Sequence, residues 1–488
     1  MGSHTVLDPR QKELLNLAAQ RGQSVNRRTL ADSIASINPP AFGHLASYAV
    51  LGMNLVFVEI EQFFESGGFL LQGEELINWL VQCLEWDLIR IEYPDGHDEP
   101  YFSCPDGVRH YFLTHLSSDE LALEHRRAIS FHSEKLALLA SDIGFVLRGG
   151  EKAIEPGGFL DQISHLPQYQ SLHHNILNYA LNWHEHLFQL REFEDAANIL
   201  NSICFALSRR GQKKLAESLL ARIATQTKGL ISLAAWINLA TLLRQEQQHS
   251  AALRIYWRTV PGLLRLRAFI QLAQVLTEIS AVYRQTGKLI PSALMLEFSV
   301  ILNGRLKNGQ SQAIAQSQLA STYRLLRMYQ PALKVSTAAI SYFRLADDRL
   351  NLGRSLLTQG NIYYNLKMIE LAFTCFDEAQ QVGRQIGDPQ AEIGALGGKA
   401  RLLMLTGFLD QAKQLLEETI SRREQIRDHT VGVEYQNLGV CYEQQGNLAL
   451  ALGWYQKAQL EFERYLPVEA PSCRRKIAAL EKKLAKRR

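Results

Sequence analysis

The 488-residue sequence lacks a long hydrophobic run. No stretch of about 18 apolar residues occurs, and the most apolar part, residues 45–57, is interrupted by Ser, Tyr, Gly and Asn. A membrane span is therefore not expected. Only six cysteines are present, with no Cys-x-x-Cys pair. We expect buried thiols in a reducing compartment, and hence a cytoplasmic protein, with neither disulfides nor a metal site.

Motifs of catalysis are also missing. The sequence has no Gly-x-Ser-x-Gly elbow, no Gly-rich dinucleotide loop and no His-Glu-x-x-His. Helical spacing does not gather His173, His174, His184 and His186, which we interpret as surface or packing residues. We predict a protein that is not an enzyme and needs no cofactor. The alternative is an enzyme, or an enzyme subunit, with its site in residues 118–170, in which His110, His115 or Glu120 would meet a nucleophile.

Alanine recurs along the C-terminal half at intervals close to 40 residues. The markers are Ala252, Ala293, Ala332, Ala372, Ala412 and Ala451, with successive separations of 41, 39, 40, 40 and 39 residues. Such a period is typical of a solenoid of helical hairpins, in which each unit buries its apolar face only against neighbouring units. A small residue at this position lets the two helices of a hairpin approach closely.

The last repeat, residues 433–462, shows the pattern most completely. Gly439 and Ala451 are small, Tyr442 and Tyr455 are large enough to fill the space beside them, and Gly446 can end the first helix in the left-handed conformation. This combination resembles the tetratricopeptide repeat (TPR). The resemblance implies a mainly α fold, a right-handed TPR superhelix with a concave groove, whose units exceed the usual length of about 34 residues.

The N-terminal part has a different pattern. Asp8-Pro9 and Asn38-Pro39-Pro40 bracket two short predicted helices over 8–36. Helices are predicted over 44–66 and 73–86, a β-hairpin from 88–93 and 101–104, and a further helix from Asp106. This order, with the passage from Cys104 to Glu120, resembles the winged-helix segment before the repeats of STAND-type signalling ATPases. No Gly-x-x-x-x-Gly-Lys-Ser/Thr loop occurs, so the chain would be a relative without its nucleotide-binding domain.

Charge is divided unevenly between these parts. Residues 1–115 carry 7 Lys and Arg against 15 Asp and Glu, a net charge of −8, and the remainder carries +11. The predicted helix over 73–86 has Glu74, Glu75 and Glu85 and no basic residue, so DNA would repel it. We therefore expect packing or protein docking from this module, and nucleic acid is the less favoured partner. A weak helix-turn-helix pattern over 24–46, with Arg27 and Arg28, leaves a DNA-binding regulator as an alternative.

One position of the first helix in each repeat would face the groove. Read down the array, it is occupied by Arg244, Arg284, Arg324, Tyr364, Met404 and Glu443. Three arginines at intervals of 40 would present planar, permanently charged donors to carboxylates or phosphates. The predicted groove residues are these arginines with Asn238, Thr241, Thr277, Ser317, Ser321, Arg354, Asn361, Tyr364, Arg401 and Gln436. The opposing interpretation is that the arginines pair with neighbouring acidic residues or lie on solvated faces.

The predicted organisation has five parts. They are N-terminal helices over 1–40, a winged-helix-like α+β module over 41–117, a helical connector over 118–170, the TPR superhelix over 171–466 and a basic capping helix over 467–488. The repeat frame between 171 and 230 stays open. We predict a non-enzymatic scaffold or sensor whose groove recognises an acidic segment of a partner protein. The alternatives are a transcriptional or signalling regulator with a DNA-binding N-terminal module and a TPR sensor, and a non-catalytic subunit of a STAND-like or other larger complex.

Overall fold

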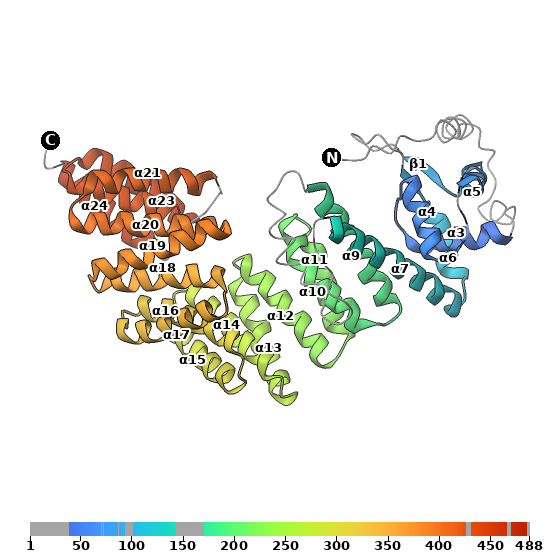
Figure 1. Cartoon of the computed structure of the whole chain (residues 1–488), viewed down its shortest axis with the longest axis horizontal. Coiled ribbons are helices and arrows are strands. Elements are labelled where there is room, and N and C mark those ends of the chain that lie inside the picture. The colour runs from blue at the N-terminus through green and yellow to red at the C-terminus, as the bar shows by residue number, and fades with distance from the viewer. Residues whose placement is uncertain are drawn as a thin grey trace. The chain divides into compact units, whose positions relative to one another are not determined.

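The computed structural model describes residues 39–69, 71, 73–85, 87–92, 101–142, 170–425, 431–465 and 470–485 (Figure 1). The helices predicted over 8–36, most of the 24–46 pattern, the turn around 94–99 and the Gly/Pro-rich interval near 149–158 lie outside these residues. The chain divides into two compact units after Leu242. That boundary falls inside helix α12, so each unit is described by itself.

The first unit begins with a small α+β module. Strands β1 (Arg90–Glu92) and β2 (Tyr101–Ser103) pair antiparallel, with Ile91 opposite Phe102. The predicted hairpin and the predicted α+β character are therefore confirmed. The helices of the module are α3 (Pro39–Leu51), α4 (Phe57–Ser66), α5 (Gly73–Glu85) and α6 (Asp106–His115).

The continuous helix predicted over 44–66 is wrong, because the chain breaks between α3 and α4. Gly52 has a φ of +69°, in the left-handed region. Leu55 then exchanges backbone hydrogen bonds with Phe102, at 3.2 and 2.9 Å, as an isolated β-bridge. The Tyr48 hydroxyl also donates to the Phe102 carbonyl, at 2.6 Å. Because Leu55 pairs with strand β2, the backbone at this point cannot continue the helix.

Long helices complete the first unit. Helix α7 (Ser118–Asp142) packs on α3, α4 and α9. The others are α9 (Gln170–Gln189), α10 (Phe193–Arg209), α11 (Lys213–Gln226) and α12 (Gly229–Gln245). Helix α9 packs on α10, and α10 packs on α11.

The second unit is an array of helical hairpins. Its helices are α13 (His249–Arg265), α14 (Phe269–Gln285), α15 (Leu289–Arg305), α16 (Gly309–Leu325), α17 (Tyr329–Leu345), α18 (Arg349–Asn365), α19 (Ile369–Ile386), α20 (Pro389–Thr406), α21 (Leu409–Gln425), α22 (Gly432–Gln444), α23 (Leu448–Tyr465) and α24 (Ala470–Ala485). We call α14, α16, α18, α20 and α22 the A helices, and α13, α15, α17, α19, α21 and α23 the B helices. The predicted fold class, mainly α with TPR-like helical repeats and a small α+β module, is confirmed.

The period in the sequence corresponds to buried helix contacts. Five of the six marker alanines are fully buried on the B helices, and Ala293 is 5% exposed. Three A helices begin after Asn308, Asp348 and Asp388, again 40 residues apart. Each of these side chains accepts a hydrogen bond from a backbone N–H in the first turn, which satisfies a donor that the helix itself leaves free.

Glycine allows the closest approaches within the array. The fully buried Phe376 ring of α19 lies against Gly360 of α18 and Gly398 of α20. A Cβ atom would come within 2.7 Å of the ring at Gly360 and within 2.5 Å at Gly398. Phe376 thus joins three helices because two neighbouring positions have no side chain.

Within the described ranges, none of the helices is both long and apolar enough to span a bilayer.

Candidate binding surface on the A helices

The A helices form a continuous inner row in the second unit. Helix α14 contacts α16, α16 contacts α18, α18 contacts α20 and α20 contacts α22, in addition to each helix's contacts within its hairpin. Side chains at equivalent positions of the A helices therefore follow one another along one face, which we call the A-helix face. Asn238 and Thr241 lie in the first unit, and the other predicted groove residues lie in the second.

Arg244, Arg284 and Arg324 occupy the last turns of α12, α14 and α16. A cation there interacts favourably with the negative end of the helix dipole. Arg244 is neutralised within the protein, because its Nε lies 2.9 Å from Glu278 Oε2 on α14. The Tyr256 hydroxyl also donates to Glu278, at 3.4 Å. Arg244 therefore follows the opposing interpretation, in which the arginine pairs with an acidic neighbour.

Arg284 differs from Arg244. Its side chain is half-buried, and within the described part of the chain its guanidinium makes no hydrogen bond or ion pair. Burial lowers the pKa of Arg284 from its ordinary value, and the nearby positive charge of Arg244 lowers it further. A cation in this environment is stabilised by any anion that reaches it. Arg324 is half-buried at the equivalent position of α16.

Farther along the A-helix face, cations are held by internal contacts. Arg401 of α20 donates to the Asn361 side chain of α18, and its guanidinium lies 5.1 Å from the centre of the Tyr364 ring. Burial lowers the pKa of Arg401, while Tyr364 and Glu434 act in the opposite direction. Arg401 thus contacts two other predicted groove residues, Asn361 and Tyr364.

A buried ion pair lies beside this cluster. Arg423 Nη2 of α21 is 3.2 Å from Glu434 Oε1 of α22, and the two side chains are only 9% and 5% exposed. Burial raises the pKa of Glu434, while Arg423 lowers it. The sequence pattern did not single out this pair, because the two residues belong to successive hairpins at non-equivalent positions.

Several of the remaining predicted groove residues also have partners within the protein. Thr277 donates to the Ala273 carbonyl at 3.0 Å, and Ser317 lies 2.8 Å from the Ser355 hydroxyl. Asn238 donates to the Asn201 side chain. Arg354 forms a longer ion pair with Asp388, at 3.7 Å. Ser321, Gln436 and Thr241 are half-buried.

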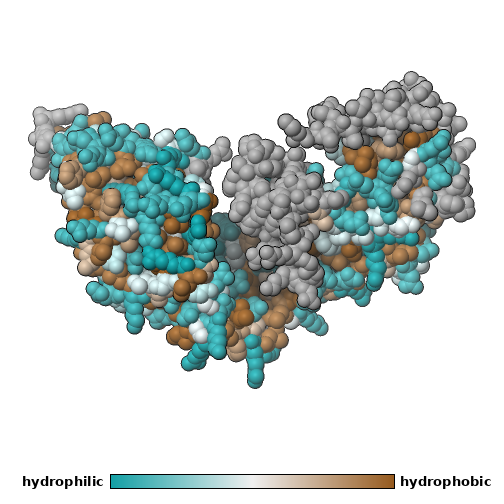
Figure 2. Space-filling model, in the orientation of Figure 1, coloured by the Kyte–Doolittle hydropathy of each residue, from teal (hydrophilic) through white to brown (hydrophobic). Residues whose placement is uncertain are grey.

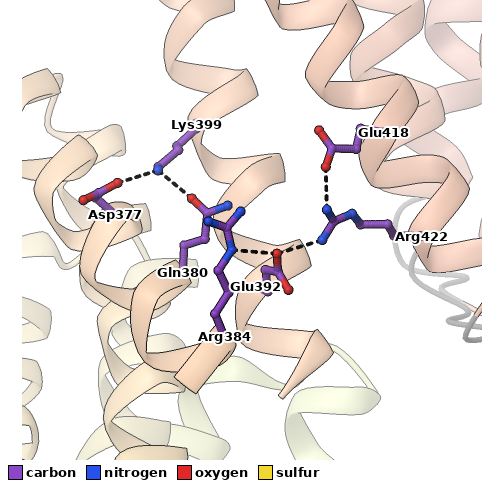
Figure 3. Close-up of polar contacts among 7 residues, drawn as sticks. All are labelled: Asp377, Gln380, Arg384, Glu392, Lys399, Glu418 and Arg422. Carbon is purple, nitrogen blue, oxygen red and sulfur yellow. Dashed lines mark hydrogen bonds and ion pairs between the residues drawn. The ribbon is translucent and has the colours of Figure 1, made fainter. Parts of the chain in front are cut away.

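Charges between α19, α20 and α21 are arranged in mutual contacts (Figure 3). Lys399 Nζ lies 2.7 Å from both Asp377 Oδ1 and Gln380 Oε1. Glu392 of α20 accepts from Arg384 at 3.0 Å and from Arg422 at 2.7 Å. In these hairpins, cations and carboxylates satisfy each other across helix boundaries.

Helix α24 packs on α23. Cys473, Ile477 and Leu480 of α24 are buried in one cluster with Tyr455 and Phe462 of α23. On the polar side, Lys483 Nζ lies 3.2 Å from Glu443 Oε1. One side of α24 is therefore apolar and packs on α23, and basic residues lie on its polar side.

Two histidines of α9, His184 and His186, are packing residues. His186 and His184 are buried, and His186 Nδ1 lies 2.8 Å from His125 Nδ1 of α7. The His132 ring stacks on His186 at 5.3 Å between centroids. Burial lowers the pKa of His132 and His186, the latter to about 3. Among the described residues, no group of three or more His, Cys, Asp or Glu is placed to hold a metal ion.

Local contacts account for two of the residues considered for an enzyme site. His115 Nδ1 lies 2.8 Å from the Tyr111 carbonyl, and its ring stacks on the Tyr111 ring. The Glu120 carboxylate accepts hydrogen bonds from the Ser117 hydroxyl at 2.6 Å and from the Ser117 backbone N–H at 2.9 Å. This reciprocal arrangement caps α7.

Comparisons with known proteins give similarity at the level of fold. No protein-family model matches the sequence, and no curated protein matches it. A solved STAND protein with a tetratricopeptide repeat sensor, from Pyrococcus horikoshii, is 13% identical over 96% of this chain and 72% of its own, with a TM-score of 0.47. A Rap protein complexed with competence and sporulation factor is 14% identical over 73% of this chain and 100% of its own, with a TM-score of 0.43.

A third solved structure is a tetratricopeptide repeat protein from Parabacteroides merdae. It is 14% identical over 57% of this chain and 98% of its own, with a TM-score of 0.42. The helix order and the helix contacts of the second unit themselves describe a TPR-like helical-repeat array.

Proposed function

We propose that the protein is a non-enzymatic scaffold or sensor, and that its A-helix face binds an acidic segment of a partner protein. Repeat arrays present extended surfaces suited to protein partners. Their rows of side chains are already formed, so little ordering entropy is lost on binding. The array itself supports the general role in protein interaction, and the arginines of its A helices support the acidic ligand.

Arg284 is the single observation that carries this proposal. Its guanidinium is half-buried and, among the described residues, has no internal acceptor. A carboxylate placed there would form charge-assisted hydrogen bonds, which are about twice as strong as neutral ones. Arg324, one repeat farther on, gives an elongated ligand a second cationic position.

The test uses a fluorescein-labelled decaglutamate peptide and the full chain. Binding is followed by fluorescence anisotropy at low ionic strength, because exposed charge interactions weaken with salt. We expect Arg284→Glu/Arg324→Glu to weaken binding at least tenfold. Lys334→Glu/Lys457→Glu is the matched control, since it changes net charge equally at two exposed positions of B helices.

A second variant keeps the test independent of folding. Arg284→Met/Arg324→Met keeps an unbranched apolar stem and removes the charge, and circular dichroism establishes that the helices persist. Weaker binding by both arginine variants, with the control unchanged, supports the A-helix face. Equal weakening by the lysine control would instead mean that net charge alone attracts the peptide, and unchanged binding by the arginine variants would refute the proposal.

A further inference from the structure

Helix α15 buries several polar residues beside Ala293 and Leu296, and exposes large apolar residues. Its buried residues include Ser292, Ser299 and Asn303, which are 0%, 0% and 2% exposed. Its outer face carries a stripe of large apolar side chains. They are Ile290, Leu294, Phe298 and Ile301, which are 66%, 46%, 58% and 55% exposed.

The stripe is regular along the helix. Its members are separated by four, four and three residues, the spacing that aligns side chains on one helical face. It is about 17 Å long at 1.5 Å per residue. Figure 2 shows hydrophobic residues at the surface over α13 and α15. Contiguous exposed apolar faces of this kind mark interaction sites in soluble proteins.

Two of the buried polar residues of α15 have internal partners. Ser299 donates to the Ala273 carbonyl of α14 at 2.9 Å, and Asn303 donates to the Ser299 carbonyl at 3.0 Å. The inner face of α15 thus combines these polar residues with the buried Ala293 and Leu296, which pack against Ala315 and Leu319 of α16. Packing within the array does not account for the large apolar residues outside.

Cations bracket the stripe. Lys288 is exposed just before Ile290, and Arg305 is exposed in register after Ile301. They are about 25 Å apart along the helix. Residues 247–346 contain twelve Lys and Arg but only two acidic residues, Glu278 and Glu297. Both are engaged, since Glu278 pairs with Arg244 and Glu297 accepts from the Tyr323 hydroxyl at 2.6 Å.

We propose that the outer face of α15 is a docking site for an acidic amphipathic helix of a partner protein. The partner's apolar side chains would cover the stripe, and carboxylates near its two ends would meet Lys288 and Arg305. This is a helix packed on a helix through i, i+4 anchors. The site belongs to a B helix, so it is distinct from the A-helix face.

Charge and width decide between possible occupants. A second copy of the chain would bring the same basic hairpins to the interface, where like charges repel. A membrane surface would also contact the neighbouring B helices. On α17 the exposed outer positions include Lys334, Thr337 and Ser341, so the apolar surface ends on that side of α15. On α13, Trp257 and Leu264 are also exposed, but the exposed Arg254 and Arg258 lie on the same helix. An acidic helix fits both the narrow stripe and its charged ends.

The test uses a designed, fluorescein-labelled 18-residue helical peptide with four leucines at the spacing of the stripe and glutamates at both ends. We expect the full chain to bind it, and Leu294→Ser/Phe298→Ser to weaken binding at least tenfold. Lys288→Glu/Arg305→Glu should weaken it similarly. Leu450→Ser/Leu460→Ser, two exposed leucines of α23, is the matched control and should leave affinity unchanged.

Two further binding experiments test the charge requirement and distinguish this site from the A-helix face. A peptide with lysines in place of the end glutamates should bind at least tenfold more weakly. Arg284→Met/Arg324→Met should bind the acidic peptide like the wild type, whatever those changes do to decaglutamate binding. No binding of the designed peptide, or equal binding by the stripe variant, overturns the proposal.

Competing occupants are tested on the wild type and the stripe variant. A dimer in sedimentation equilibrium that dissociates in Leu294→Ser/Phe298→Ser would assign the stripe to a second copy. Co-sedimentation with phosphatidylserine-containing vesicles, lost in the same variant, would assign it to a membrane surface. Either result contradicts a partner helix, and a monomer that does not bind vesicles supports it.

Discussion

Replacing Gly398 by alanine should destabilise the array, although alanine is the better helix former. In a helix interior the exchange is worth about 1 kcal/mol in favour of alanine. Here the new methyl group would lie within 2.5 Å of the Phe376 ring. The ring cannot retreat toward α18, because it already lies against Gly360. Overpacking a well-filled core costs about 1–3 kcal/mol.

The upper part of that range applies, since both sides of the ring are blocked. We therefore expect a net loss of about 2 kcal/mol in the free energy of unfolding. For a unit of this size, the loss lowers the melting temperature by about 4–8 °C. Urea unfolding followed by circular dichroism measures the first quantity. Hydrogen exchange of α18 to α20 shows whether the effect is local.

Gly453 provides the matched control. It lies inside α23, is exposed, and an added Cβ would meet nothing within 4 Å. Gly453→Ala should therefore stabilise by about 1 kcal/mol. Phe376→Leu should recover part of the loss in the Gly398→Ala background, because the two sites share one space. If Gly398→Ala were as stable as Gly453→Ala, the account of packing at Phe376 would be refuted.

Two further predictions concern buried ionisable groups. His186 has a pKa of about 3 in the folded protein against 6.5 ordinarily, so the stability from its neutral ring is present above pH 6.5 and is lost as pH falls toward 3. Lowering the pH from 7 to 5 should cost about 2 kcal/mol from this histidine, and His132 adds in the same direction. Urea unfolding at both pH values should show that His132→Phe loses less unfolding free energy between pH 7 and pH 5 than the wild type. An equal loss would contradict the assignment of part of this pH dependence to His132. Glu434→Ala should lower the free energy of unfolding by about 3–5 kcal/mol, because it leaves Arg423 buried without its carboxylate. Arg423→Met/Glu434→Met should lower it less. If urea unfolding showed the double variant to be less stable than the single one, this account would be disproved.

The repeat architecture was predictable because its signals are periodic. The marker alanines and the caps at Asn308, Asp348 and Asp388 recur every 40 residues or so, and each reports a local requirement of helix packing or capping. The contact between Arg401 and Asn361 follows the same logic, since these residues are 40 apart and occupy the same position in adjacent hairpins.

Other features depend on contacts between segments that no period relates. The break after α3 requires Leu55 to pair with Phe102, far along the chain. His125 and His132 are seven residues apart on one face of α7, but His186 joins them only through the packing of α7 on α9. The pairing of Arg244 with Glu278 likewise depends on which helix lies beside α12.

The stripe on α15 was visible in the sequence but open to a different interpretation. An apolar helix within a repeat array is expected to be buried, and only the exposed fractions show which face is inside. Helical periodicity places Ile290, Leu294, Phe298 and Ile301 on one face. It does not say that the opposite face, with Ser292 and Ser299, is the one that packs.

The most direct test of the account is a selection from a random peptide library on the intact chain, with peptides eluted and sequenced from the wild type and from Arg284→Met/Arg324→Met in parallel. The account predicts that a group of peptides rich in Asp and Glu is enriched by the wild type and lost from the variant, because the arginines of the A-helix face hold their carboxylates. Enrichment of the same acidic peptides by both proteins, or of peptides without an acidic excess, would contradict the central claim.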